Sequence, residues 1–215
     1  MSTLAEVMAG VAVDMAGFHD ELNRLDAVAG DGDLGNTVAM AARAVLAAID
    51  ASGDADPATL LRRCGTDVAT GAPSTTGTLT ARGMLGAARA IGAASDEPAV
   101  RLLHAGFAAA LAAIQSAGKA APGDKTMIDA LAPAVTALGE HADAGSQLPA
   151  ALSAAAAAAR LGAEQTKNMT PQAGRARWLA ERARGAEDAG ARFVALVLES
   201  AASRLDDMHE SLGPR

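Results

Sequence analysis

Three aspartates stand within eight residues of one another in a glycine-rich segment near the start of the chain. The segment reads LDAVAGDGDLG and carries carboxylates at Asp26, Asp31 and Asp33. Its glycines allow sharp turns that can bring these side chains together. Hard divalent cations prefer oxygen ligands, and magnesium in particular binds a few carboxylates together with substrate phosphates. The segment therefore indicates a magnesium site, and the structural alternative is a solvated turn with an aspartate that caps the next helix.

The same segment fits poorly to a calcium loop of the helix-loop-helix type, because the glutamate expected at the end of such a loop is missing. The next helix is predicted to begin near Asn36. Its N-terminus can therefore also face an anion, since the first backbone N–H groups of a helix have no partner within it.

A second candidate is the hydroxyl-rich run Ser74, Thr75 and Thr76 before Gly77. Hydroxyls and free N–H groups at a helix start are good phosphate ligands, and an ordinary N-cap is the alternative. The run is not a P-loop, because no lysine follows the glycine in the required place.

Two further motifs have weaker signals. In the run PGDKTMID, residues 122–129, Asp124 is expected to cap a helix and Asp129 to be exposed. In the run GRARW, residues 174–178, an arginine can bind a phosphate through two N–H groups, and a surface arginine is the alternative. The four histidines show no metal-ligand spacing, and Cys64 is interpreted as a structural thiol.

The elements that must position these residues are helices. Half of the 215 residues are apolar, chiefly Ala, with one Trp, three Phe and no Tyr. Alanine has the best helix propensity, whereas strands would need more β-branched and aromatic residues. Apolar positions recurring at three and four residues predict eight helices. Their approximate ranges are 3–24, 36–49, 57–69, 78–91, 98–117, 126–143, 148–165 and 191–205. Residues 167–190 are expected to be irregular or short-helical, and residues 206–215 a frayed tail.

Eight helices joined by short loops predict an all-α fold, an antiparallel up-and-down barrel or bundle, formed by residues 1–215 as one domain. In such a fold alternate loops share one end. The polar loops after the first, third and fifth helices, and the irregular segment before the last helix, are therefore expected to converge on one site.

Composition argues against several functions. The net charge of −7 is unfavourable for binding nucleic acid. A single cysteine fits a reducing compartment, the first residues lack the pattern of a secretory signal, and the apolar stretches are short. We expect a cytoplasmic protein without a membrane span.

The runs LNRLDAVAGDGDLG, PGDKTMIDAL and TKNMTPQAGR together resemble the nucleotide-binding domain of dihydroxyacetone kinases. More closely, the chain resembles the ADP-binding L subunit of the bacterial phosphotransferase-dependent enzyme, from about Leu4 to Leu205. This resemblance implies an eight-helix antiparallel barrel with the nucleotide across one open end. It also implies two magnesium ions, held by Asp26, Asp31 and Asp33, that bridge the phosphates.

The resemblance further implies a set of nucleotide contacts from four segments of the chain. Gly118 and Met127 would line the adenine side, and Arg175 with residues 188–190 would close the site. The full set is Leu34, Gly35, Asn36, Thr37, Thr75, Thr76, Gly118, Met127, Arg175, Asp188, Ala189 and Gly190. No catalytic nucleophile is expected, because phosphoryl transfer needs charge neutralisation and in-line positioning more than covalent chemistry.

In the family's bacterial system, bound ADP is rephosphorylated by a phosphohistidine protein of the phosphotransferase system. The γ-phosphoryl group then passes to dihydroxyacetone on a separate subunit. The resemblance implies both partners for this chain.

Four positions depart from the family pattern. Leu34 replaces the usual His or Thr, Pro73-Ser-Thr-Thr-Gly77 replaces Gly-Gly-x-Ser-Gly, Asp188-Ala-Gly190 replaces Asp-Pro-Gly, and Arg177-Trp178 replaces Ser-Tyr. The metal motif is intact, so these departures concern the identity of the phosphoryl acceptor and of the phosphoryl donor. Two alternatives stay open: an ATP-dependent kinase component for another small ketose or polyol-derived substrate, and a nucleotide-dependent regulatory module.

Overall fold

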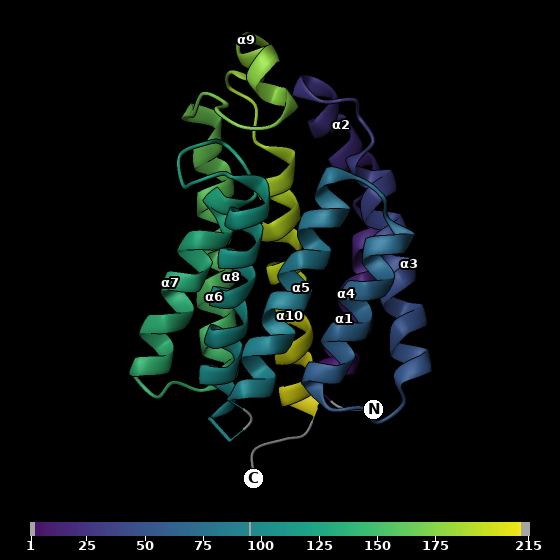
Figure 1. Ribbon diagram of the computed structural model, residues 1–215. Coiled ribbons are helices and arrows are strands. Elements are labelled where there is room, and N and C mark those ends of the chain that lie inside the picture. Colours follow the sequence, from purple (N-terminus) through teal and green to yellow (C-terminus); the bar gives the residue numbers. More distant parts are fainter. Residues whose placement is uncertain (1–2, 95, 212–215) are drawn as a thin grey trace.

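The chain folds into a barrel of α-helices, shown in Figure 1. This computed structural model describes residues 3–94 and 96–211, without the side chains of residues 175, 176 and 211, and these residues contain no strand. The helices are α1 Thr3–Gly17, α2 His19–Ala29, α3 Leu34–Ser52, α4 Pro57–Gly71, α5 Thr75–Ala93, α6 Ala99–Gly118, α7 Ile128–Asp143, α8 Leu148–Gln165, α9 Ala180–Ala183 and α10 Ala189–Ser211. Two short 3-10 turns, η1 Thr166–Asn168 and η2 Arg175–Leu179, lie between α8 and α9.

The long helices pack in chain order and the ring closes on itself. α1 packs on α3, each helix from α3 to α8 packs on the next, and α10 lies between α8 and α1. Helix α2 continues the direction of α1 and also packs on α3. With α1 and α2 counted as one unit, the described residues form the predicted eight-helix antiparallel barrel. The all-α prediction is therefore confirmed.

The first predicted helix, residues 3–24, is wrong in two respects. The chain breaks at Phe18, where the N–H of Phe18 bonds to the carbonyl of Met15 and the backbone leaves helical geometry. Helix α2 then continues to Ala29, so Asp26 lies in its last turn and not in a loop. The apolar spacing is the same on both sides of the break, and for this reason periodicity alone did not reveal it.

The last helix is also longer than predicted. Helix α10 extends through residues 206–211, which the sequence assigned to a frayed tail, and residues 212–215 lie outside the described part. An ion pair between Arg204 of α10 and Asp14 of α1 fastens this end of the helix to the barrel, at Nε–Oδ2 and Nη2–Oδ1 distances of 2.9 and 2.5 Å. Residues 167–190, predicted to be irregular or short-helical, contain the short helical pieces η2 and α9, as expected.

Alanine dominates the contact between α7, α8 and α10. Eight alanines there are fully buried: Ala130, Ala134, Ala151, Ala155, Ala159, Ala163, Ala191 and Ala195. Small side chains let helix axes approach closely, since interaxial distance depends on the side chains at the contact. Larger residues such as Leu138 and Leu198 fill the space between these alanine layers.

Within the described part of the chain, two helices, α3 and α6, are long and apolar enough to cross a membrane by length and composition alone. Both are members of the barrel, α3 between α1 and α4 and α6 between α5 and α7. Buried residues make up 39% of the apolar stretch of α3 and 17% of that of α6.

The core contact of Leu138 gives a test of this packing. Its side chain is 0% exposed, so Leu138→Ala should lower the free energy of unfolding by about 2–5 kcal/mol through lost burial and a residual cavity. Leu161 of α8 is 54% exposed, and Leu161→Ala should change it by less than about 0.5 kcal/mol. Urea unfolding followed by circular dichroism measures both, and equal losses in the two variants would contradict the packing described.

Candidate functional site

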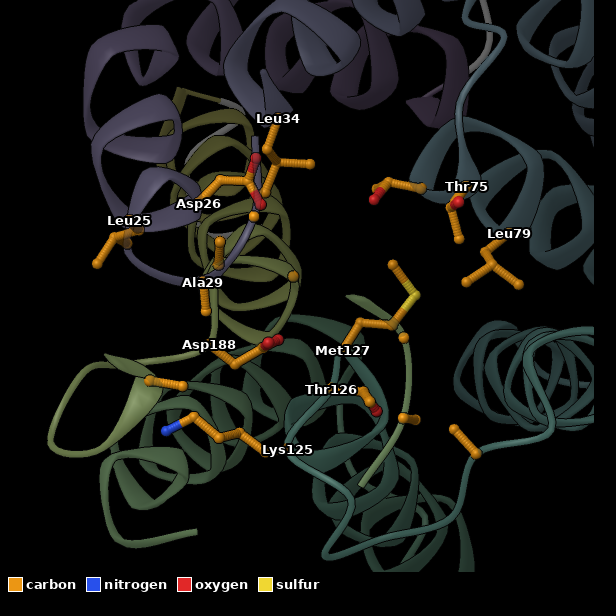
Figure 2. A pocket seen from close by; sticks show the side chains of 18 of the residues that line it. Leu25, Asp26, Ala29, Leu34, Thr75, Leu79, Lys125, Thr126, Met127 and Asp188 are labelled. Atoms are coloured by element: carbon orange, nitrogen blue, oxygen red, sulfur yellow. The ribbon is translucent and has the colours of Figure 1, made fainter. Parts of the chain in front are cut away.

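Four connecting segments meet at one end of the barrel, opposite the end where the chain termini lie (Figure 1). They are the α2–α3 turn, the α4–α5 turn, the α6–α7 loop and the long α8–α10 connection. Together they surround a cavity of about 500 Å³, to which every one of them contributes lining residues (Figure 2). The predicted convergence of alternate loops is confirmed.

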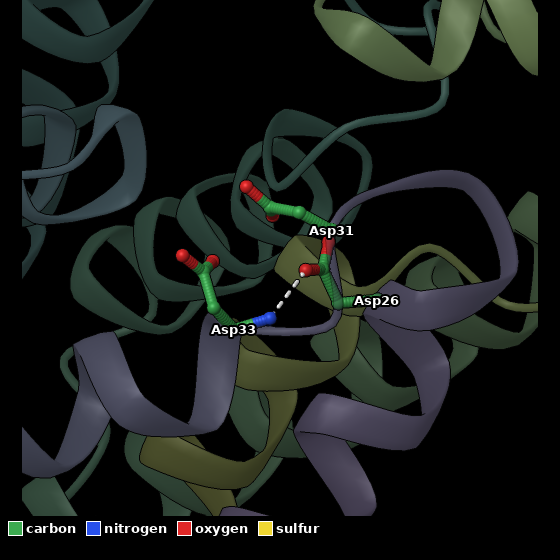
Figure 3. Close-up of side chains that lie close together, drawn as sticks. All are labelled: Asp26, Asp31 and Asp33. Carbon is green, nitrogen blue, oxygen red and sulfur yellow. Dashed lines mark hydrogen bonds between the residues drawn. The ribbon is translucent and has the colours of Figure 1, made fainter.

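Asp26, Asp31 and Asp33 form a compact acidic cluster beside this cavity (Figure 3). Each offers a carboxylate oxygen, and these oxygens lie within 4.8 Å of one another. Asp26 is partly buried and its Oδ2 accepts the backbone N–H groups of Gly32 and Asp33, at 2.8 and 3.0 Å. Asp31 and Asp33 are exposed. Three carboxylates this close repel one another, and an all-oxygen donor set of this size fits a hard divalent cation such as magnesium.

The turn that holds the cluster depends on two glycines. A Cβ at Gly30 would lie 2.2 Å from Oδ1 of Asp26, so any side chain there would displace that carboxylate. Gly32 has φ of 77°, a left-handed conformation that glycine adopts at little cost. These positions explain why Asp26, at the end of a helix, can share a site with Asp31 and Asp33.

The first residues of α3 divide between two environments. Leu34 and Thr37 line the cavity. Gly35 instead packs on α2, where its N–H donates to Oδ1 of Asn23 at 2.6 Å and a Cβ would lie 2.1 Å from the carbonyl oxygen of His19. Asn36 bonds through Oδ1 to Nε2 of His19 at 2.7 Å. Gly35 and Asn36 are thus outside the cavity lining, and their contact with a nucleotide stays a prediction.

Helix α5 begins at Thr75, three residues earlier than the sequence indicated. Ser74 is its N-cap and accepts the N–H of Gly77 at 3.0 Å. Thr75 and Thr76 occupy the first turn and line the cavity. Since the first N–H groups of a helix lack partners within the helix, this turn presents donors suited to a phosphate.

Asp124 in the α6–α7 loop and Asp129 at the start of α7 do not have the roles expected from the sequence. Asp129 is buried, and its carboxylate accepts the N–H groups of Gly123 and Thr126 at 2.5 and 2.8 Å. Asp124 is partly buried, and its Oδ2 accepts the N–H of Ala121 at 2.8 Å. The expectation of a capping Asp124 and an exposed Asp129 is therefore wrong, because Asp129 folds back over the loop that precedes it. Gly118 and Met127, at the two ends of this loop, line the cavity.

No functional role is predicted for Lys125 from the sequence. In the structure its side chain is buried at the cavity wall. Its Nζ donates to the carbonyl oxygens of Thr166 and Ala186 at 2.6 and 2.7 Å. Burial lowers the pKa of this ammonium group, and the nearby Asp188 carboxylate opposes the shift. Lysine in a polar loop normally indicates a solvated side chain, so the sequence carried no signal for this burial.

Asp188 lies on the same wall, and Ala189 and Gly190 follow it. Burial raises the pKa of its carboxyl group to about 7, against the lowering effects of the Ala191 N–H and of the Lys125 charge. Its Oδ1 accepts the N–H of Ala191 at 2.7 Å, which caps the start of α10. A carboxyl group that stays largely protonated below about pH 7 repels an anionic ligand less than an ionised one would.

The segment that follows η1 covers the cavity from the outside. Trp178 lines it and is 76% exposed, with the Arg177 guanidinium 4.5 Å from the centre of its ring. The side chain of Arg175, predicted to close the site, lies outside the described part of the structure. Its role stays a prediction.

Comparison with known proteins assigns the family. The sequence profile of the DAK2 domain matches residues 28–203, which is most of the chain. The chain belongs to the DAK2 domain family. This confirms the resemblance to dihydroxyacetone kinases.

Relatives of this DAK2 domain are named as kinases. It is 37% identical over 191 residues to the L-erythrulose kinase of Pectobacterium atrosepticum, covering 86% of this chain and 32% of that protein. It is 35% identical over 195 residues to the triokinase/FMN cyclase of Bos taurus, covering 90% and 33%. The chain therefore spans about a third of the length of these relatives.

Solved structures agree with the family. The dihydroxyacetone kinase of C. freundii superimposes with a TM-score of 0.72 at 30% identity, over 94% of this chain and 34% of that one. A second structure of the same kinase, in complex with AMP-PNP and Mg2+, matches to the same extent.

Gly30 provides a direct test of the acidic cluster in this DAK2 domain. Gly30→Ala should weaken divalent-ion binding more than about tenfold, because the added Cβ displaces the Asp26 carboxylate. Gly17→Ala is the matched control, since a Cβ there meets nothing within 4 Å. Titration with Mn2+ followed by paramagnetic relaxation of water measures both. Equal affinities in the two variants would show that Asp26 is not a ligand.

The raised pKa of Asp188 predicts how the free energy of unfolding depends on pH. The folded carboxyl keeps its proton to about pH 7, whereas in the unfolded chain it ionises near its usual value. The folded state therefore binds more protons across this window, and its stability falls as pH rises through it. Asp188→Asn should remove most of this fall, and Asp143→Asn, an exposed control on α7, should retain it. Urea unfolding at about pH 5 and pH 8, without metal or nucleotide, measures the difference.

Proposed function

We propose that this chain is the nucleotide-binding component of a small-ketose kinase. It would hold ADP or ATP through magnesium and present the γ-phosphoryl group for transfer to dihydroxyacetone. The observation that carries the proposal is the acidic cluster beside the cavity, with three carboxylate oxygens within 4.8 Å. The structure of a dihydroxyacetone kinase with AMP-PNP and Mg2+, which matches nearly the whole chain, supports a magnesium nucleotide as the ligand.

Each end of the cavity suits one part of a nucleotide. Asp26, Asp31 and Asp33 would hold magnesium, proposed as two ions, and the metal supplies charge neutralisation at the phosphates. The first turn of α5, with Thr75 and Thr76, would bind phosphate oxygens through N–H and hydroxyl groups. The opposite wall is apolar and would contact the base. Its residues are Leu79, Ile114, Gly118, Ala120 and Met127.

The ketose itself needs a separate binding site, which we place outside this chain. The relatives are about three times as long, so the ketose site corresponds either to the rest of such a protein or to a partner subunit. For the donor we propose a phosphohistidine protein of the phosphotransferase system, acting on bound ADP in the cytoplasm. Neither nucleic acid nor a membrane takes part in this function.

A second candidate changes the acceptor and the donor. Relatives at 36 and 37% identity are named D-erythrulose and L-erythrulose kinases, which favours a four-carbon ketose. In that case ATP would bind, react and leave as ADP in each cycle. Tightly held ADP that is rephosphorylated in place supports the first candidate, and freely exchanging ATP supports the second. Mass spectrometry of the small molecule that copurifies, with and without a chelator, separates them.

The metal ligands give the decisive test. Asp31→Ala and Asp33→Ala should each weaken ADP binding in magnesium by more than about tenfold, since each removes a charged ligand of the bridging metal. Asp50→Ala, on the exposed face of α3, is the control and should bind as the wild type does. Isothermal titration calorimetry measures affinity, and circular dichroism checks helicity. Unchanged affinity in both variants would refute the nucleotide site.

A further inference from the structure

Lys125 lies at the junction of three segments that form one wall of the cavity. Its side chain is only 4% exposed, and its backbone has φ of 59°, a conformation that side-chain-bearing residues rarely adopt. Figure 2 shows the side chain running along the wall on the same side as Asp188. A strained backbone and a buried ammonium group are both unfavourable in isolation, so surrounding contacts must hold them in place.

Those contacts are two carbonyl groups from distant parts of the chain. The Thr166 carbonyl belongs to the first residue after α8, and the Ala186 carbonyl stands two residues before Asp188; Nζ lies 2.6 and 2.7 Å from their oxygens. Hydrogen bonds from a charged donor are roughly twice as strong as neutral ones. One ammonium group thus joins the α6–α7 loop to both ends of the α8–α10 connection.

Neighbouring hydrogen bonds extend this junction to the cavity surface. The N–H of Asp188 donates to the Thr166 hydroxyl at 2.9 Å, and the N–H of Gly185 donates to the Lys167 carbonyl at 3.2 Å. On the other side of Lys125, only Thr126 separates it from Met127, and Met127 and Gly190 are near neighbours across the cavity wall. The separation of residues 186–190 from Met127 therefore depends on where the Lys125 ammonium is held.

We propose that Lys125 is a positioning residue for the nucleotide site. It acts through the two carbonyl groups, and it fixes the Asp188–Gly190 wall against Met127 so that the base end of the cavity has its binding shape. The identity of the ligand rests on the proposed function above. The metal cluster lies on the α2–α3 turn, which Lys125 does not contact through either hydrogen bond, so metal binding should not depend on this residue.

A methionine substitution tests the charge separately from the packing. Lys125→Met keeps an unbranched apolar side chain of similar length and removes the donor to both carbonyls. Lys119→Met is the matched control, because Lys119 lies in the same loop, also has a left-handed backbone with φ of 50°, and is exposed. Lys125→Met should weaken magnesium-ADP binding at least about tenfold, and Lys119→Met less than about twofold. Mn2+ affinity should stay at the wild-type value in both variants.

The outcomes separate this inference from the proposed function. If the wild type does not bind ADP, the proposed function fails. If the wild type binds ADP and Lys125→Met binds it within about twofold, the positioning role is wrong. Loss of Mn2+ binding together with ADP binding in Lys125→Met would also overturn it, because the effect would then be a general loss of structure.

A measurement on the wild-type protein keeps the test decisive if Lys125→Met does not fold. The chain has three lysines, Lys119, Lys125 and Lys167, so 15Nζ spectra are simple, and Lys119→Met and Lys167→Met assign the third signal. Magnesium-ADP should slow hydrogen exchange of the Lys125 ammonium further, because a ligand held by the wall suppresses its opening. Exchange at Lys125 that is as fast as at Lys119 in the ADP complex would overturn the inference.

Discussion

The repulsion among three neighbouring carboxylates is the constraint on which the site depends. Asp26, Asp31 and Asp33 approach closely because a helix end, a left-handed glycine and a second helix start follow one another within a few residues. Backbone N–H groups stabilise the charge of Asp26, the most buried of the three. A divalent cation shared with a phosphate group would offset the mutual repulsion of the three carboxylates at the cavity edge.

The barrel brings the acidic turn together with three other connecting segments. Because successive helices are antiparallel, every second connection emerges at the same end. Because α10 packs on α1 and closes the ring, four of these segments, far apart in sequence, surround one cavity. The alanine-rich contacts of α7, α8 and α10 keep the barrel narrow enough for these connections to meet. The acidic turn, the α5 N-terminus and the apolar wall then present charge, N–H donors and apolar surface to one cavity, and the proposed nucleotide ligand would use all three.

The cavity wall formed by the α6–α7 loop and the α8–α10 connection is held by buried polar side chains. The carboxylate of Asp129 accepts N–H groups of the preceding α6–α7 loop, and the ammonium group of Lys125 donates to carbonyls of the α8–α10 connection. A buried polar group without a hydrogen-bond partner destabilises the fold, whereas a fully paired one favours a single arrangement of its partners. Such groups therefore fix irregular segments that lack the backbone hydrogen bonds of a helix. This explains how a long connection can form a defined binding surface.

The sequence by itself determined the helical class, the barrel order, the convergence of polar loops and the acidic cluster, because these follow from local periodicity and from residues adjacent in the chain. Only the tertiary structure decided that the first helix breaks at Phe18, that Gly35 and Asn36 face α2, and that Lys125 and Asp129 are buried. The physical reason is that burial of a polar side chain depends on partners distant in sequence. Thr166 and Ala186, 41 and 61 residues beyond Lys125, have no signature in the run around it.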